Sequence, residues 1–123
     1  MNKLFLTLTF LLIACPAWAD YRFAENWSKT DTAYEAAFVG LTIIDWGQTR
    51  NIVREHYEES NIILGKHPSM SEVDTYMPLA IVAHAVIAAA LPPKYRRYWQ
   101  VLWIGVEAGA TINNAKLGLR IEF

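Results

Sequence analysis

Three ionisable residues, Asp45, His84 and Glu107, each lie inside a largely apolar stretch of the chain. A charge in apolar surroundings is costly unless a neighbouring group pairs with it, so these residues are expected to contact partners or to do chemistry. A carboxylate beside an imidazole can transfer protons, which makes the three residues the candidate catalytic groups. Their scattered positions lack the close spacing of metal-binding motifs, so no metal site and no cofactor are predicted.

Three helices must position these residues, and the sequence marks where each begins. Thr32-x-x-Glu35 and Ser69-x-x-Glu72 have the pattern of capping boxes, and Pro93 suits the first turn of a helix. We therefore predict helices over residues 33–57, 72–91 and 93–116. The predicted fold is all-α: an N-terminal signal segment (1–19), an irregular lead-in (20–31), and one helical domain (32–123) that is a three-helix bundle with a short extended C-terminal tail.

Helix geometry predicts which of the three charges meet. The Pro92-Pro93 turn makes the second and third helices antiparallel neighbours, and a rise of about 1.5 Å per residue lets their levels be compared. If the first helix is antiparallel to the second, Asp45 reaches the level of His84, close to Gln100. Glu107 is then expected in a second cluster with Thr49, Tyr76 or Arg50. These pairs either fix the register of the helices or form a proton-handling or metal site, and both interpretations stay open.

Polar residues form a narrow stripe on each of two helices. Thr42, Asp45, Thr49 and His56 share one face of the first helix. Gln100, Glu107, Thr111 and Asn114 share one face of the third. In a soluble periplasmic bundle such stripes face water, whereas in a membrane bundle they face inward and the wide apolar arcs contact lipid. We favour a membrane-associated bundle, although its apolar segments are shorter than the roughly 17–25 residues of a full span.

Export is predicted from the first 19 residues. A positive start, an apolar run and Ala17-x-Ala19 fit a signal peptide cleaved between Ala19 and Asp20. Alternatively, Cys15 ends a lipobox and would be acylated, which makes the protein a lipoprotein. Without residues 1–19 the chain carries 10 basic and 12 acidic residues, so nucleic acid is not an expected partner. The expected location is the cell envelope, at the inner membrane or in the periplasm.

Two motifs resemble a known pattern: D-W-x-Q-T at positions 45–49 and E-x-N-x-x-L-G-x-H-P-S at positions 59–69. Together with G-V-E-A-G at 105–109, they resemble a small uncharacterised family of exported or membrane proteins from bacterial and phage genomes. The resemblance implies a shared envelope fold and no known activity. It also implies that five residues act together: Asp45, Gln48, Thr49, Glu59 and Asn61.

These observations favour a small exported envelope protein with an interaction or structural role. Its expected partner is the inner membrane or a membrane protein, and Gly105-x-x-x-Gly109 allows close packing of a second copy. The candidate binding residues are Gln48, Thr49, Glu59, Asn61 and His67. The alternative is a small periplasmic or intramembrane enzyme that uses Asp45 and His84, or the loop around His67.

Overall fold

The computed structural model describes residues 22–123. The predicted signal peptide, its cleavage site and Cys15 lie outside the described residues. Within them the chain forms three helices, α2 (Lys29–Arg54), α3 (Met70–Ala90) and α4 (Pro93–Lys116). No strand occurs in residues 22–123, so the predicted all-α fold with an extended tail is confirmed.

The first helix begins four residues earlier than predicted. Ser28 is its N-cap, and its side-chain oxygen accepts from the backbone N–H of Asp31, whose carboxylate accepts in turn from the N–H of Ser28. The expected capping box at Thr32 is therefore wrong, and the lead-in is shorter. An aspartate can complete the box because its carboxylate satisfies the same free N–H groups that a glutamate would.

α2 also ends three residues before the predicted boundary. His56 has a φ of +58°, and the N–H of Tyr57 donates to the carbonyl of Ile52 at 3.0 Å. This left-handed cap ends a helix although no glycine is present to adopt it at low cost. His56, predicted to continue the polar stripe, is consequently exposed beyond the end of the helix.

α4 begins at Pro93 as predicted, and α3 begins at Met70, two residues before its predicted start. Ser69 and Glu72 form the reciprocal capping box of α3, and α3 continues through Pro78 to Ala90. Pro93 starts α4 in a first turn that needs no N–H. At the other end Gly118 has a φ of +81°, the left-handed conformation that glycine adopts without strain.

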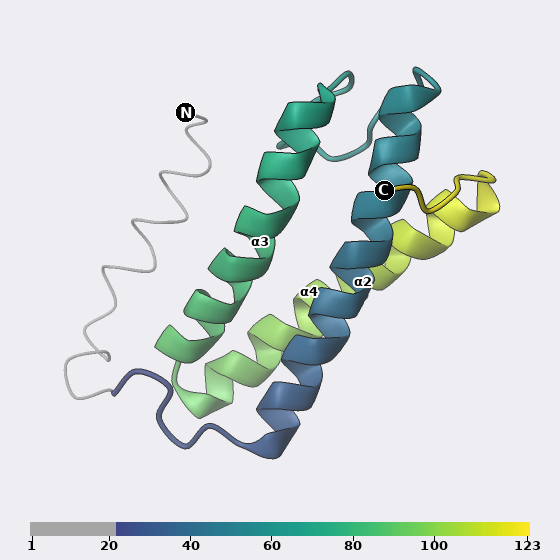
Figure 1. Ribbon diagram of the computed structural model, residues 1–123. Helices are drawn as coiled ribbons and strands as arrows, with labels where there is room; N and C mark the ends of the chain where they lie inside the picture. Colours follow the sequence, from purple (N-terminus) through teal and green to yellow (C-terminus); the bar gives the residue numbers. More distant parts are fainter. Residues whose placement is uncertain (1–21) are drawn as a thin grey trace.

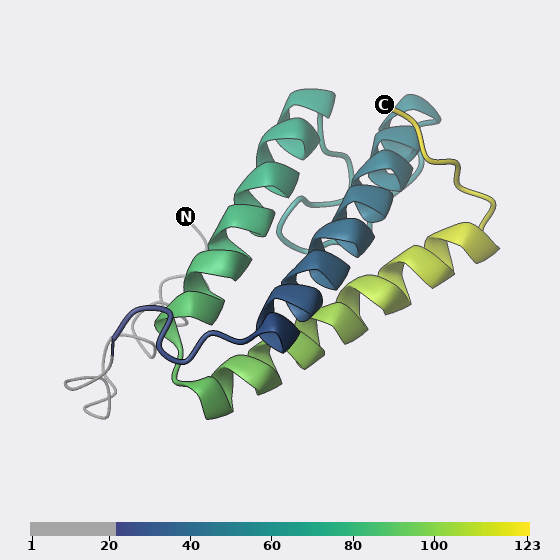
Figure 2. The same ribbon diagram turned by 60° about the horizontal axis from the view of Figure 1, so that its bottom comes forward.

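α2 lies between the other two helices. Figures 1 and 2 show α3 and α4 meeting at the Pro92 turn and diverging from it, with α2 running between them. We call this end, where α2 and α4 begin, the Pro92 end. The C-terminal tail, yellow in both figures, turns back from α4 and runs along α2.

Gly47 lets the tail lie directly against α2. The N–H of Glu122 donates to the carbonyl of Gly47 at 3.1 Å, and Phe123 packs edge-on against Trp46. A Cβ at position 47 would lie 2.5 Å from Ile121 Cγ2, a distance that forces the tail to move. The missing side chain at this one position is therefore required by the close approach of the tail.

The interior of the bundle is unusually polar. Among the described residues, more polar or charged residues than hydrophobic ones are buried. The buried hydrophobic residues are Phe38, Ile52, Val73, Met77, Ala88, Ala89 and Leu91. Buried polar groups are tolerated only when partners satisfy them, so hydrogen bonds must do much of the work of joining the helices.

The outer faces of α3 and α4 are correspondingly apolar. Large exposed hydrophobic residues lie along both helices: Leu79, Val82 and Val86 on α3, and Tyr98, Val101, Leu102 and Val106 on α4. α3 has a mean hydropathy of 1.5 over its most apolar window, of which 28% is buried. By length and composition alone α3 could cross a membrane. The low burial sets it apart from the core helix of a soluble protein.

Candidate functional site

The polar stripes of α2 and α4 face the interior of the bundle. The inward face of α2 repeats at spacings of three and four residues and carries Asp31, Glu35, Phe38, Thr42, Asp45, Thr49 and Ile52. On α4 the corresponding face carries Arg96, Gln100, Glu107, Thr111 and Asn114. Of the two predicted orientations, the inward one is therefore observed for every member of the stripes except His56.

Three carboxyl groups converge at the end of the bundle opposite Pro92. We call Asp45, Glu59 and Glu107 the carboxylate cluster, contributed by α2, the loop after α2, and α4. Asp45 is 9% exposed, and its Oδ1 accepts from Asn114 Nδ2 at 2.9 Å. Glu59 and Glu107 each hold one carboxylate oxygen that is buried without a hydrogen-bond partner.

Burial and mutual repulsion raise the pKa values of two of these carboxyl groups, Asp45 and Glu107. Burial raises the pKa of Asp45 to about 6, and the charge of Glu59 acts in the same direction, while the bond from Asn114 opposes them. Burial likewise raises the pKa of Glu107 to about 7, with a further contribution from the charge of Asp45. Since the charge of one carboxylate disfavours the charge of the other, Asp45 and Glu107 lose their protons in linked steps around neutral pH.

The loop after α2 closes over this cluster through Asn61. Its Nδ2 donates to the hydroxyl of Tyr76 at 3.3 Å, and its Oδ1 accepts from the N–H of Ile63. The N–H of Asn61 donates to Glu59 Oε1 at 2.8 Å. Burial raises the pKa of Tyr76, and the charges of Glu107, Asp45 and Glu59 act in the same direction. Asn61 thus joins the loop to α3 beside the three acids.

His84 belongs to a second polar group, near the Pro92 end, which we call the His84 network. His84 Nδ1 lies 2.9 Å from Glu35 Oε2, and Gln100 Nε2 donates to Glu35 Oε1 at 3.0 Å. The imidazole stacks on Phe38, with ring centroids 3.7 Å apart, and faces Trp99 at 5.4 Å. Its Nε2 is buried without a partner. The aromatic rings on both sides fix the ring plane.

Glu35 remains ionised in this network. Burial alone would raise the pKa of Glu35, but hydrogen bonds from His84 and Gln100 outweigh it and lower the pKa. Three helices each supply one member, so the network holds α2, α3 and α4 at a common level. The predicted association of His84 with Gln100 is thereby observed, with Glu35 between them.

The predicted contact between Asp45 and His84 is wrong. Asp45 bonds to Asn114, and His84 pairs with Glu35, which lies ten residues and about 15 Å before Asp45 along α2. The prediction assumed only that α2 and α3 are antiparallel, and the long loop between them does not fix their relative level. The second expected cluster is partly observed, because Glu107 does face Tyr76 and is joined there by Asp45.

Arg96 anchors the Pro92 end and is completely buried. Its Nε donates to the carbonyl of Ala88 at 2.8 Å, its Nη1 to Asp31 at 3.3 Å, and its Nη2 to the carbonyl of Glu25 at 2.9 Å. The guanidinium also lies over the ring of Trp27, 4.9 Å from its centroid. A planar group with five donors suits this position, where several acceptors converge.

The remaining predicted binding residues are divided between the interior and the surface. Gln48 and Thr49 are buried, and Gln48 Nε2 donates to the carbonyl of Thr111 at 3.3 Å. His67 is exposed and lies 3.9 Å from the equally exposed carboxylate of Glu58. The structure therefore brings Asp45, Glu59 and Asn61 together and leaves His67 on the surface.

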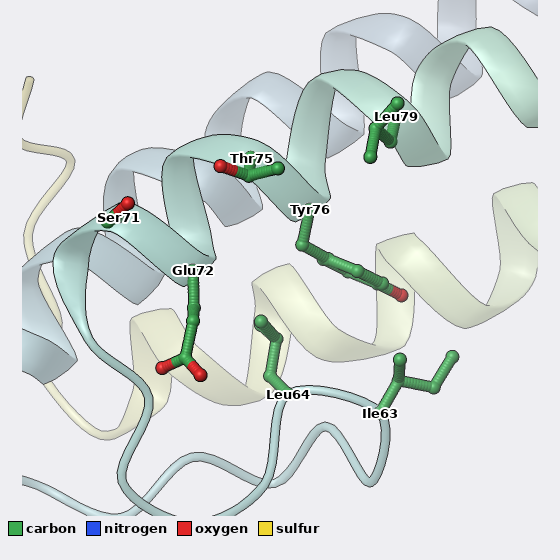
Figure 3. Close-up of a pocket in the computed structure, with 7 residues that line it drawn as sticks. All are labelled: Ile63, Leu64, Ser71, Glu72, Thr75, Tyr76 and Leu79. Atoms are coloured by element: carbon green, nitrogen blue, oxygen red, sulfur yellow. The ribbon is translucent and has the colours of Figure 1, made fainter. Parts of the chain in front are cut away.

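Two open pockets flank the loop after α2. One of about 380 Å³ lies between this loop and α3, and in Figure 3 Glu72 and Tyr76 extend from α3 toward Ile63 and Leu64. The other, of about 510 Å³, lies within the loop itself and includes Glu59 and Asn61 in its lining. Ile62 is 82% exposed, so the apolar triplet 62–64 does not fold under the bundle.

The geometry restricts the chemistry of these sites. No group of three or more His, Cys, Asp or Glu residues within positions 22–123 is arranged to hold a metal ion. Asp45 and Glu107 can exchange protons near neutral pH.

Sequence reasoning missed Asp31, Glu35 and Arg96 as members of the polar interior. Glu35 was predicted to form a capping box with Thr32, Asp31 to belong to the lead-in, and Arg96 was given no role within the third predicted helix. The missing signal was the stripe itself. Continued toward the Pro92 end at spacings of three and four, it passes through Glu35 and Asp31 on α2, and through Arg96 on α4.

Comparison with known proteins found no matching family, no significantly similar curated protein and no similar solved structure. The resemblance of the D-W-x-Q-T and H-P-S motifs to bacterial and phage envelope proteins thus stays a prediction.

Proposed function

We propose that this protein is a small, non-catalytic component of the bacterial cell envelope that associates with the inner membrane or with a membrane protein. The observation that carries the proposal is the distribution of polarity in the bundle. Acids, amides, an arginine and a histidine lie inside, and large apolar residues lie outside. In water the large apolar residues would stay exposed and contribute no burial to stability. In contact with lipid the apolar surface is buried, while the polar groups keep their partners inside the bundle.

The proposal includes export, with cleavage between Ala19 and Asp20 as the favoured route. Acylation of Cys15 is the alternative, and mass spectrometry of the mature N-terminus distinguishes the two products. The apolar faces of α3 and α4 supply the membrane contact in either case. If the family resemblance holds, lysis support or exclusion of other phages would be natural roles by analogy.

Membrane retention after a carbonate wash tests the proposal. The double substitution Val82→Asp and Leu102→Asp places charges on the two apolar faces, and we expect the protein to move to the soluble fraction. The matched control, Thr75→Asp and Asn113→Asp, changes exposed polar positions on the same helices and should remain with the membrane. Wild-type protein that washes off completely would refute the proposal.

The carboxylate cluster favours one second function, a proton-binding role for Asp45 and Glu107. Their raised pKa values and the unpartnered oxygen of Glu107 are what an intramolecular proton relay or a general acid would need. This candidate replaces the predicted enzyme site at Asp45 and His84, which have different partners. Loss of proton uptake near pH 7 in Glu107→Gln, with membrane retention and folding unchanged, would favour this role.

A further inference from the structure

The Pro92 end gathers basic residues in excess of acidic ones. Five bases lie there, and solvent reaches four of them. Arg22, Lys29 and Lys94 are exposed, and the side chain of Arg97 is 40% exposed. The fifth, Arg96, is buried. The segment containing Arg22 is held at this end because the N–H of Ala24 donates to the carbonyl of Ala89 at 2.7 Å.

Two of the three described acids at the same end are paired within the bundle. Asp31 pairs with Arg96 and Arg97, and Glu35 pairs with His84 in the network described above. Glu25 is the third acid. The field of the described side chains at this end is therefore positive. The N-termini of α2 and α4 add to it, and Arg96 donates to the carbonyls at the C-terminus of α3, which has the opposite sign. The rest of the described chain carries five bases and eight acids and has no such excess.

Aromatic side chains surround these bases. Phe23, Tyr95 and Tyr98 are 66%, 54% and 68% exposed. Lys94 Nζ lies 5.9 Å from the centre of the Tyr95 ring. Exposed aromatic rings beside lysine and arginine are typical of protein surfaces that lie at the level of lipid headgroups, where the rings are half in water and the cations meet phosphate.

We propose that the Pro92 end is a docking surface for anionic phospholipid headgroups. The cations of Arg22, Lys29 and Lys94 contact the phosphates, and the apolar faces of α3 and α4 continue from this end into contact with lipid. Charge complementarity selects the occupant, because an anionic membrane offers the negative field that this end lacks. This inference rests on the proposed membrane association and adds its orientation and its lipid preference.

The test compares two triple variants that each remove three positive charges. Arg22→Gln, Lys29→Gln and Lys94→Gln change the Pro92 end. Lys66→Gln, Lys116→Gln and Arg120→Gln change exposed bases at the opposite end and serve as the control. Because net charge is equal in both variants, a difference between them reports position.

Full-length protein in neutral detergent micelles is titrated with phosphatidylglycerol or phosphatidylcholine, and bound lipid is measured by native mass spectrometry and by the melting temperature. We expect wild type and the control to prefer phosphatidylglycerol. The Pro92-end variant should bind it roughly a hundredfold more weakly, since each base near an anionic surface contributes about fivefold.

Three results would overturn the inference. They are equal weakening in both variants, equal binding of the two lipids, and an identical response to inorganic phosphate at the same concentration, which would indicate a site for the free anion. These three results would leave the proposed membrane association standing. The carbonate wash of wild type and of the Val82→Asp, Leu102→Asp variant tests that association separately. Circular dichroism verifies that both triple variants are folded.

Discussion

Asp45 should make the folded protein less stable as the pH rises, and removing its charge should reverse the effect. The carboxyl is 9% exposed, and its one hydrogen bond comes from Asn114 Nδ2. The substitution Asp45→Asn keeps an oxygen that can accept this bond and removes the charge that repels Glu59 and Glu107. We therefore expect Asp45→Asn to be stabilising at neutral and alkaline pH.

The size of the effect follows from the pKa. In the folded protein Asp45 has a pKa of about 6, against 3.8 for the exposed group, and this difference corresponds to about 3 kcal/mol. The folded state holds the proton more tightly than the unfolded chain. The contribution of Asp45 is therefore most favourable below pH 3.8, and it is lost as the pH rises through about 6. At pH 8 the variant should gain roughly 2–3 kcal/mol in free energy of unfolding, and almost nothing at pH 4.

Urea unfolding followed by the helical circular dichroism signal measures this difference at each pH. Asp74→Asn is the matched control, because hydrogen bonds from Arg50 and Trp46 lower the pKa of Asp74 and burial opposes them only weakly. That variant should lose stability at pH 8. A gain in Asp45→Asn that is independent of pH, or a loss at pH 8, would refute the account of the carboxylate cluster.

Three further substitutions test the packing and the second polar group. Arg96→Ala should lower the free energy of unfolding by roughly 3–5 kcal/mol, read by urea titration, because it removes the buried guanidinium that donates to three carbonyls and to the carboxylate of Asp31. Gly47→Ala should cost roughly 1–3 kcal/mol and expose the tail to proteases, whereas Gly40→Ala, with open space around it, should gain about 0.5–1 kcal/mol. Equal melting temperatures for these two glycine variants would count against the tail contact. Burial alone would raise the pKa of Glu35, but the hydrogen bonds from His84 and Gln100 lower it below 4.5. Wild type should therefore lose stability as the pH falls below 4.5, and Glu35→Gln should lose less over that range.

Much of the fold could be predicted because its signals are local. Ser69-x-x-Glu72, the Pro92-Pro93 break and Gly118 each act within a few residues, and the ends of the helices they delimit were predicted to within two residues. The boundaries of α2 were misjudged for a physical reason. Its cap at Ser28 is completed by an aspartate, and its end at His56 is a left-handed residue without glycine.

The pairing of the charges could be predicted less well, because it depends on relative helix levels. Asp45, His84 and Glu107 are all buried or half-buried, as the cost of isolated charge requires. Their partners, however, depend on a loop of fifteen residues between α2 and α3, which sequence spacing does not fix. An error of a few helical turns in the relative level of α2 and α3 exchanges Glu35 for Asp45 as the predicted partner of His84.

The central position of α2 has a consequence for how the chain assembles. The polar pairs that join it to the rest are far apart in sequence: 49 residues separate Glu35 from His84, 65 separate Asp31 from Arg96, and 69 separate Asp45 from Asn114. Most helical proteins complete their contacts between near neighbours and fold within milliseconds. Here His84, Arg96 and Asn114 of α3 and α4 gain their carboxylate partners only when α2 packs between the two helices. Expressed alone, the segment of α3 and α4 should lack a fixed arrangement of its two helices, and adding α2 as a separate peptide should order them.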